Sequence, residues 1–168
     1  MRIALLTLAA MAAFGAPARA ETVAAPTPSI GQALQERLDE DYGPREGAYL
    51  QALTERFVEE ALTRAGATLS EGQAPLTVDI TILDAVPNRP TLQQMSDHPG
   101  LSLESFGVGG ARFQAVIRDV NGLVVATVEH DYYQSNIFDA ISASTWTDAR
   151  HAARGFARKV ARAYVALG

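Results

Sequence analysis

The 168-residue sequence contains no cysteine. Disulfide bonds are therefore excluded, and packing must stabilise the chain even in an oxidising compartment. The absence of cysteine also excludes a lipid attached through its thiol. Three histidines are present, and none stands at metal-ligand spacing from another histidine or from an acidic motif. We therefore expect no cofactor and no metal site.

The sequence also lacks a surplus of basic residues. It has 14 Lys and Arg against 19 Asp and Glu, a net charge of −5. Proteins that bind nucleic acid normally show the opposite balance, so we expect no nucleic-acid partner. The apolar run at residues 3–14, which only Thr7 interrupts, is shorter than the roughly 20 residues that a transmembrane helix needs. We therefore expect no stable membrane anchor.

Residues 1–20 have the features of a secretory signal peptide. A short basic start precedes the apolar run, and Ala18-Arg19-Ala20 supplies the small residues that signal peptidase accepts. We predict cleavage after Ala20 and a periplasmic or secreted location. Residues 21–29 contain two prolines and no periodicity, which predicts a mobile leader. Residues 30–168 are long enough for a single domain with its own core.

Three segments have helical patterns. Residues 30–42 could form a short helix with Ser29 as its cap, although a strand remains an alternative there, and Gly43-Pro44 would end it. Residues 46–65 show apolar positions at spacings of three and four beneath a strongly acidic outer face. A final helix is predicted to begin near Thr145, with Asp148 completing a capping box.

The final helix also carries an i, i+4 row of basic residues. These are Arg150, Arg154, Arg158 and Arg162. Such a row could bind a phosphate-rich surface, but a solvated face is the favoured interpretation because the chain is acidic overall. The acidic helix at 46–65 is the expected neighbour, and opposite charges would orient the two helices more than stabilise them.

Two patterns predict an antiparallel sheet. Residues 76–82 alternate apolar and polar side chains, as in a half-buried strand that ends near Pro87. Asn121-Gly122 favours a two-residue type I′ turn, which would fix the register of a hairpin. One face would pair Ile117 with Ala126, Ala115 with Val128, Phe113 with His130, and Ala111 with Tyr132. The other face would pair Arg118 with Val125, Val116 with Thr127, Gln114 with Glu129, and Arg112 with Asp131.

The first of these faces is apolar, so the two helices should cover it. We therefore predict an α+β fold, a two-layer sandwich in which an antiparallel sheet of three or four strands carries two main helices on one face. Strand directions place two long connections, residues 87–109 and 133–144, at the same end of the sheet. Long connections in compact domains are usually functional or disordered. Mixed polar and aromatic residues there form the predicted binding surface. They are Arg89, His98, Phe106, Tyr133, Asn136 and Phe138.

No reactive constellation is evident. No serine lies in a G-x-S-x-G elbow, and we predict no catalytic residue. A hydrolase that uses His98 or His130 with Asp97 or Asp131 remains the alternative, and it would require a histidine and a carboxylate within about 3 Å of each other in an open pocket. Glycines at 107, 109 and 110 precede a strand instead of a helix, so they indicate conformational freedom and not a phosphate-binding loop.

Several segments together resemble a family of bacterial envelope proteins. They are the strand at 76–85 followed by Pro87-Asn88-Arg89-Pro90-Thr91, the Gly109-Gly110-Ala111 strand opening, the turn at 119–125 and the Trp146-Thr147-Asp148-Ala149-Arg150 helix opening. The chain is similar over residues 45–165 to the domain of unknown function family 3313. Many members are lipoprotein-like and carry an acylated cysteine, which this chain lacks. The resemblance implies the fold and an envelope location and supplies no activity.

These observations predict an exported envelope protein that acts as a non-catalytic binding or assembly module. Its partner would be an envelope protein or a small ligand, and the sequence does not define the oligomeric state.

Overall fold

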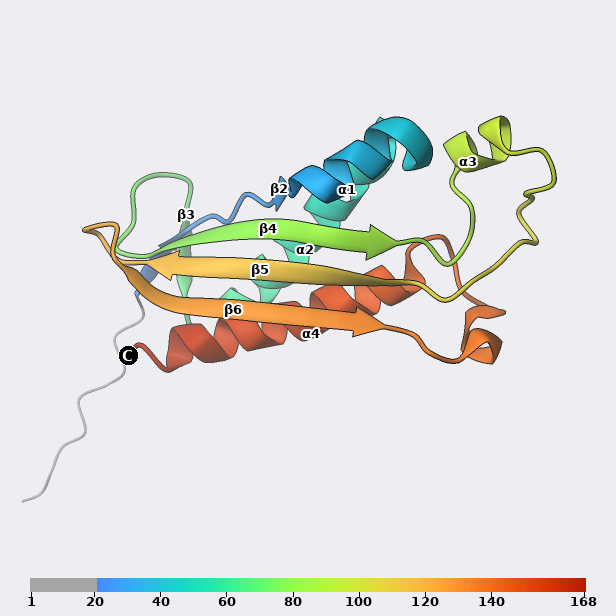
Figure 1. Ribbon diagram of the computed structural model, residues 1–168. Helices are drawn as coiled ribbons and strands as arrows, with labels where there is room; N and C mark the ends of the chain where they lie inside the picture. Colours follow the sequence, from blue (N-terminus) through green and yellow to red (C-terminus); the bar gives the residue numbers. More distant parts are fainter. Residues whose placement is uncertain (1–20) are drawn as a thin grey trace, which may run out of the picture.

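The computed structural model describes residues 21–168, so the predicted signal peptide and its cleavage site lie outside the described residues. A four-stranded sheet, in the order β2-β4-β5-β6, forms one layer, and helices α2 and α4 lie against one of its faces (Figure 1). The predicted two-layer α+β sandwich is confirmed. The elements in chain order are β1 Thr22–Ala24, β2 Ser29–Ile30, α1 Gln32–Arg37, the π-helix η1 Leu38–Tyr42, α2 Pro44–Arg64, β3 Thr68–Ser70, β4 Thr77–Val86, α3 Leu92–Asp97, β5 Gly110–Arg118, β6 Val124–Tyr133, the 3-10 helix η2 Ile137–Ala140 and α4 Thr147–Val165.

The segment predicted as a mobile leader is part of the fold. β1 pairs in parallel with β3 in a small second sheet, and β2 pairs in parallel with β4 at the edge of the main sheet. Val23 is fully buried in the core. Strands of two or three residues are too short to show a period of two, so composition alone gave the wrong prediction for residues 21–29.

Residues 30–42 contain both of the structures considered for them. Ile30 ends β2, and Gly31 is the N-cap of α1 without a side-chain hydrogen bond, so the predicted Ser29 cap is wrong. Ser29 Oγ instead donates to the carbonyl of Ile80, 2.9 Å away. The helix continues as the wider π-helix η1, which ends at Gly43, whose φ of 94° only glycine adopts readily. Pro44 starts α2, since proline has the φ angle that the first helical position needs.

The β5–β6 hairpin has the predicted register but a different turn. Gly122 has a φ of 78°, whereas Asn121 does not have a positive φ, which excludes type I′. Asp119 instead bonds to Leu123 and encloses a three-residue loop. With this loop alone, β6 would slip by one residue and its two faces would be exchanged. A bulge at Val125 adds one residue and restores the predicted register.

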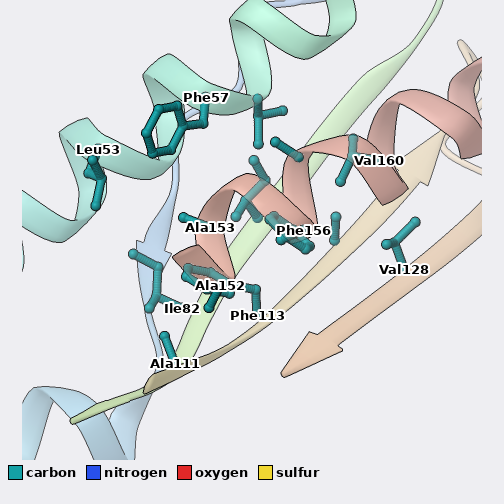
Figure 2. Packing of buried hydrophobic residues seen from close by; sticks show 14 of the residues in the cluster. Leu53, Phe57, Ile82, Ala111, Phe113, Val128, Ala152, Ala153, Phe156 and Val160 are labelled. Atoms are coloured by element: carbon teal, nitrogen blue, oxygen red, sulfur yellow. The ribbon is translucent and has the colours of Figure 1, made fainter. Parts of the chain in front are cut away.

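The pairs from Ile117–Ala126 to Ala111–Tyr132 and from Val116–Thr127 to Arg112–Asp131 are therefore confirmed. Arg118 is the exception, because it pairs with Val124 and not with Val125. Phe113 is buried and stacks on Phe156 of α4, with ring centroids 5.1 Å apart. Figure 2 shows this aromatic pair in the core between the helices and the sheet.

Helices α2 and α4 lie side by side as predicted. The acidic residues of α2 do not pair with the basic row of α4, however. Within residues 21–168 no ion pair joins the two helices. Arg150 instead donates to the hydroxyl of Tyr49, and Arg154 lies over the ring of Phe57. Among the helices of this part of the chain, none has the length and apolar character to cross a membrane.

Candidate functional site

The two long connections, 87–109 and 133–144, meet at one end of the sheet, which we call the loop end. Gln134 N donates to the carbonyl of Gly109 (2.9 Å), and Asn88 N donates to that of Thr145 (2.7 Å). Both connections contain a short helix, α3 or η2. A capping box starts α3, because Thr91 accepts from the backbone of Gln94 and the Gln94 side chain bonds back. The T-x-x-Q pattern could have predicted this helix.

A buried polar network holds the loop end together. Asn88 and Asp148 are 1% and 8% exposed. The Asn88 side chain donates to the Asp148 carboxylate (2.5 Å) and to the carbonyl of Gly107 (3.2 Å), and its oxygen accepts from Asp148 N (2.9 Å). Gly109 N also donates to the Asp148 carboxylate (3.1 Å). Both polar atoms of the Asn88 side chain and one carboxylate oxygen of Asp148 therefore join the segment after β4, the first loop and α4.

This network corrects the predicted capping box at Thr145. The N-cap of α4 is Trp146, whose own side chain makes no capping bond, and the first-turn amide of Asp148 donates to Asn88 instead. The Asp148 carboxylate binds groups of the loop instead of the backbone of Thr145. It nevertheless lies in the first turn of α4, where the helix dipole favours a negative charge. The segments that carry the family resemblance at 87–91, 109–111 and 146–150 thus meet in one network.

Arg89 links the two connections directly. Its Nε and Nη2 donate to the carbonyls of Ala143 (2.5 Å) and Ile141 (2.6 Å), and its Nη1 donates to that of Leu103 (2.7 Å). Its guanidinium also lies 5.9 Å from the ring centroid of Phe106. The sequence predicted that Arg89 would contact a ligand, but all three nitrogens bind the protein itself. These bonds position the loop end, and a ligand contact through Arg89 stays a prediction.

The other predicted site residues do not form one cluster. Tyr133 donates its hydroxyl to Asp84, which also pairs with Arg37. Burial, followed by the hydrogen bond to the Asp84 carboxylate, raises the pKa of Tyr133. Asn136 accepts a hydrogen bond from the backbone of Phe138 and starts η2. His98 lies at the end of α3, where its Nε2 is 3.2 Å from Asp41 of η1.

Exposed apolar side chains are numerous at the loop end, and most of them were missed from the sequence. Leu103 is 70% exposed and Phe138 is 74% exposed, although both sit on backbone that Arg89 or η2 holds in place. Unlike buried positions, these residues have no periodicity, so only their position in a long connection could have indicated them. The exposed apolar residues of the two connections are Leu92, Leu101, Leu103, Phe106, Val108, Ile137, Phe138 and Ile141.

The histidines do not combine with the carboxylates that the sequence offered. Asp97 accepts a hydrogen bond from Gln93 instead of His98. His130 faces α4, where an added Cβ on Gly155 would overlap its ring. Burial lowers the pKa of His130, and the positive charge of Lys159 lowers it further. Within residues 21–168 no group of three His, Asp or Glu side chains could hold a metal ion.

The glycines that open β5 are needed for close packing. A Cβ on Gly109 would lie 2.7 Å from the Asn88 oxygen, and a Cβ on Gly110 would overlap the carbonyl oxygen of Tyr132. Neither glycine has a positive φ. The expectation of conformational freedom is therefore wrong for these two positions, since what they provide is space for the network and for β6.

The sequence matches no protein-family model and no curated protein. Among solved structures, PelC from Paraburkholderia phytofirmans, a dodecamer, is similar with a TM-score of 0.51 and 13% identity over 87% of this chain and 90% of that chain. A minor lipoprotein from Acinetobacter baumannii gives a TM-score of 0.41 and 13% identity over 88% of this chain and 94% of that chain. The likeness to PelC shows a common fold, and membership of family 3313 stays a prediction.

Proposed function

We propose that the chain is an exported, non-catalytic module of the bacterial envelope that docks on another protein through its loop end. The observation that carries this proposal is the set of exposed apolar side chains, Leu103 and Phe138 foremost, on two connections that Arg89 ties together. Large apolar patches on a protein surface commonly mark sites of contact with another protein. A protein surface is therefore the favoured occupant over a small polar ligand.

The polar network supports a binding role because it orders the surface before any partner arrives. Asn88 and Asp148 are buried and bond to each other and to the loop backbone, so the loops do not need to fold on binding. Surfaces that are already ordered lose less conformational entropy on association, which increases affinity. A hydrolase would instead need a base in an open pocket, and the His98–Asp41 pair lies on an exposed surface and lines none of the described hollows.

The test compares apolar substitutions at the two ends of the sheet in the mature protein. Leu103→Ser with Phe138→Ser removes apolar surface from the loop end. Val120→Ser with Leu123→Ser is the matched control, because these side chains are 77% and 64% exposed in the hairpin turn at the opposite end. Since PelC is a dodecamer, copies of this chain are the first partner to measure, by sedimentation velocity across a concentration series. Photo-crosslinking in cells from position 141, an exposed position on the same connection that neither variant changes, then captures any other envelope protein.

We expect the loop-end variant to lose self-association or crosslinking while it keeps the thermal stability of the wild type. Equal losses in the control variant, or a wild type that is monomeric and crosslinks to no protein, would overturn the proposal. Intact mass of the periplasmic protein tests the export step, and recovery of the chain with residues 1–20 still attached would contradict it.

A further inference from the structure

A second surface feature lies away from the loop end, between the carboxyl-terminal half of α2 and the middle of α4. It is a hollow of ≈ 320 Å³. Three arginines reach it from two helices, and one carboxylate accompanies them. The lining residues are Phe57, Glu60, Ala61, Arg64, Arg154, Ala157 and Arg158. A concentration of positive charge is unexpected in a chain with a net charge of −5.

The acidic face of α2 does not neutralise this hollow. Glu55 and Glu59 continue a row at spacing four that begins with Gln51, and Gln51 donates to the carbonyl of Pro28 (2.7 Å). That row therefore faces the amino-terminal segment and not α4. The one acid in the hollow is Glu60, and Arg64 of the same helix already binds it at 2.8 Å.

The arginines of α4 in the hollow carry no carboxylate partner among the described residues, and packing holds Arg154 in place. Arg154 lies 5.0 Å from the ring centroid of Phe57, a cation–π contact that fixes its side chain. Arg158 follows one turn later on the same row and is exposed. Neither guanidinium forms an ion pair with any residue from 21 to 168. Their hydrogen-bonding forks are therefore free to bind an oxyanion.

The geometry points to a binding site for phosphate groups in this hollow, with Arg64, Arg154 and Arg158 as the ligand-binding residues. Guanidinium groups match the oxygens of phosphate in charge and shape, and such charge-assisted bonds are stronger than neutral ones. Three arginines offer more donors than one carboxylate can accept, and a tetrahedral phosphate can accept from all of them. The site is separate from the loop end, so it stands whether or not the proposed docking function holds.

Titration calorimetry of the mature protein with inorganic pyrophosphate at low salt tests the site. Arg154→Gln with Arg158→Gln should weaken binding about a hundredfold, because each lost charge-assisted bond is worth about tenfold in affinity. Arg112→Gln with Arg162→Gln is the matched control, since it removes the same charge from exposed positions outside the hollow. Glu60→Gln should tighten binding, a gain that unfolding does not explain.

The phosphate could belong to a soluble compound or to a phospholipid headgroup, and co-sedimentation with vesicles distinguishes them. Capture by phosphatidylglycerol–phosphatidylcholine vesicles, but not by pure phosphatidylcholine, with the same dependence on Arg154 and Arg158, would assign a headgroup. Binding of pyrophosphate without vesicle capture would assign a soluble ligand. The inference is wrong if the wild type binds neither probe, or if the control variant loses as much affinity as the hollow variant. Thermal melts verify folding, and Arg64→Gln, at a 73% exposed side chain, provides a second variant.

Discussion

Gly110 shows how a single missing side chain controls the loop end. A Cβ there would overlap the Tyr132 carbonyl oxygen and press on Tyr133, both of which belong to the neighbouring strand. We predict that Gly110→Ala lowers the free energy of unfolding by about 1 to 3 kcal/mol, the usual cost of overpacking. Gly107→Ala is the control, because nothing lies within 4 Å of its Cβ position and its φ is not positive. Denaturant melts that show similar losses for both variants would contradict this account.

His130 gives the stability a pH dependence. Burial lowers its pKa in the folded protein, and Lys159 and Arg158 of α4 lower it further, against the opposing effect of Asp131. The unfolded chain therefore takes up the proton first, near its ordinary pKa of about 6.5. The stability that neutral His130 contributes is complete above that value and is lost as the pH falls towards the folded pKa.

We expect the free energy of unfolding to fall between about pH 7.5 and about pH 5.5, and to fall less in His130→Gln. Denaturant melts at the two pH values measure the difference. His98→Gln, at an exposed ring on the loop end, is the comparison, because the charge of His151 itself lowers the pKa of His130. If it flattens the pH dependence as much as His130→Gln does, His130 is not the group responsible.

At the scale of elements, the hairpin separates what the sequence could predict from what it could not. Alternating apolar residues require Ile117 to face Ala126, and that requirement predicted the register correctly. It did not predict how the chain arrives there, because a two-residue turn and a three-residue turn with a bulge both satisfy it. Turn type depends on φ at Asn121 and Gly122, which the Asn-Gly pair alone does not determine.

The two-residue and three-residue turns predict different effects of alanine substitution at residues 121 and 122. Within this turn only Gly122 has a positive φ. Gly122→Ala should therefore lower the free energy of unfolding by about 1 to 2 kcal/mol, the penalty for a side chain in the left-handed region. Asn121→Ala should stay within about 0.5 kcal/mol, whereas a type I′ turn would penalise both substitutions. Equal losses in denaturant melts would restore the type I′ assignment.

For the whole molecule, the amino-terminal segment decides how far the fold extends. Val23 is fully buried, and its neighbours bond to β3 and to the start of β4. Val23→Ala should lower the free energy of unfolding by about 1 to 3 kcal/mol, from lost apolar burial and the cavity that remains. Thr27→Ala, at an exposed position of the same segment, should change it by less than about 0.5 kcal/mol. Similar melts for Val23→Ala and the wild type would support the mobile leader.

Separation along the chain explains most of what the sequence could not predict. Helix α2 and strand β4 follow from local periodicity, and their bounds lie within two residues of the prediction. Asn88 and Asp148, by contrast, stand 60 positions apart, and β2 lies about 50 positions from its partner strand. Nothing local marks such pairs. The position of the two connections was predictable from strand directions, but the bonds that Arg89 makes across them were not.

The two ends of the described chain lie together, far from the loop end. The Tyr164 hydroxyl of α4 is 3.2 Å from the Glu21 nitrogen and 3.3 Å from its carbonyl oxygen, at the same end of the sheet as the hairpin turn (Figure 1). A tag, linker or support joined at either terminus would therefore leave from one pole and keep the opposite pole unobstructed. A circular permutant that joins residue 168 to residue 21 through a short linker should fold, and new termini in the hairpin turn would leave the loop end unchanged.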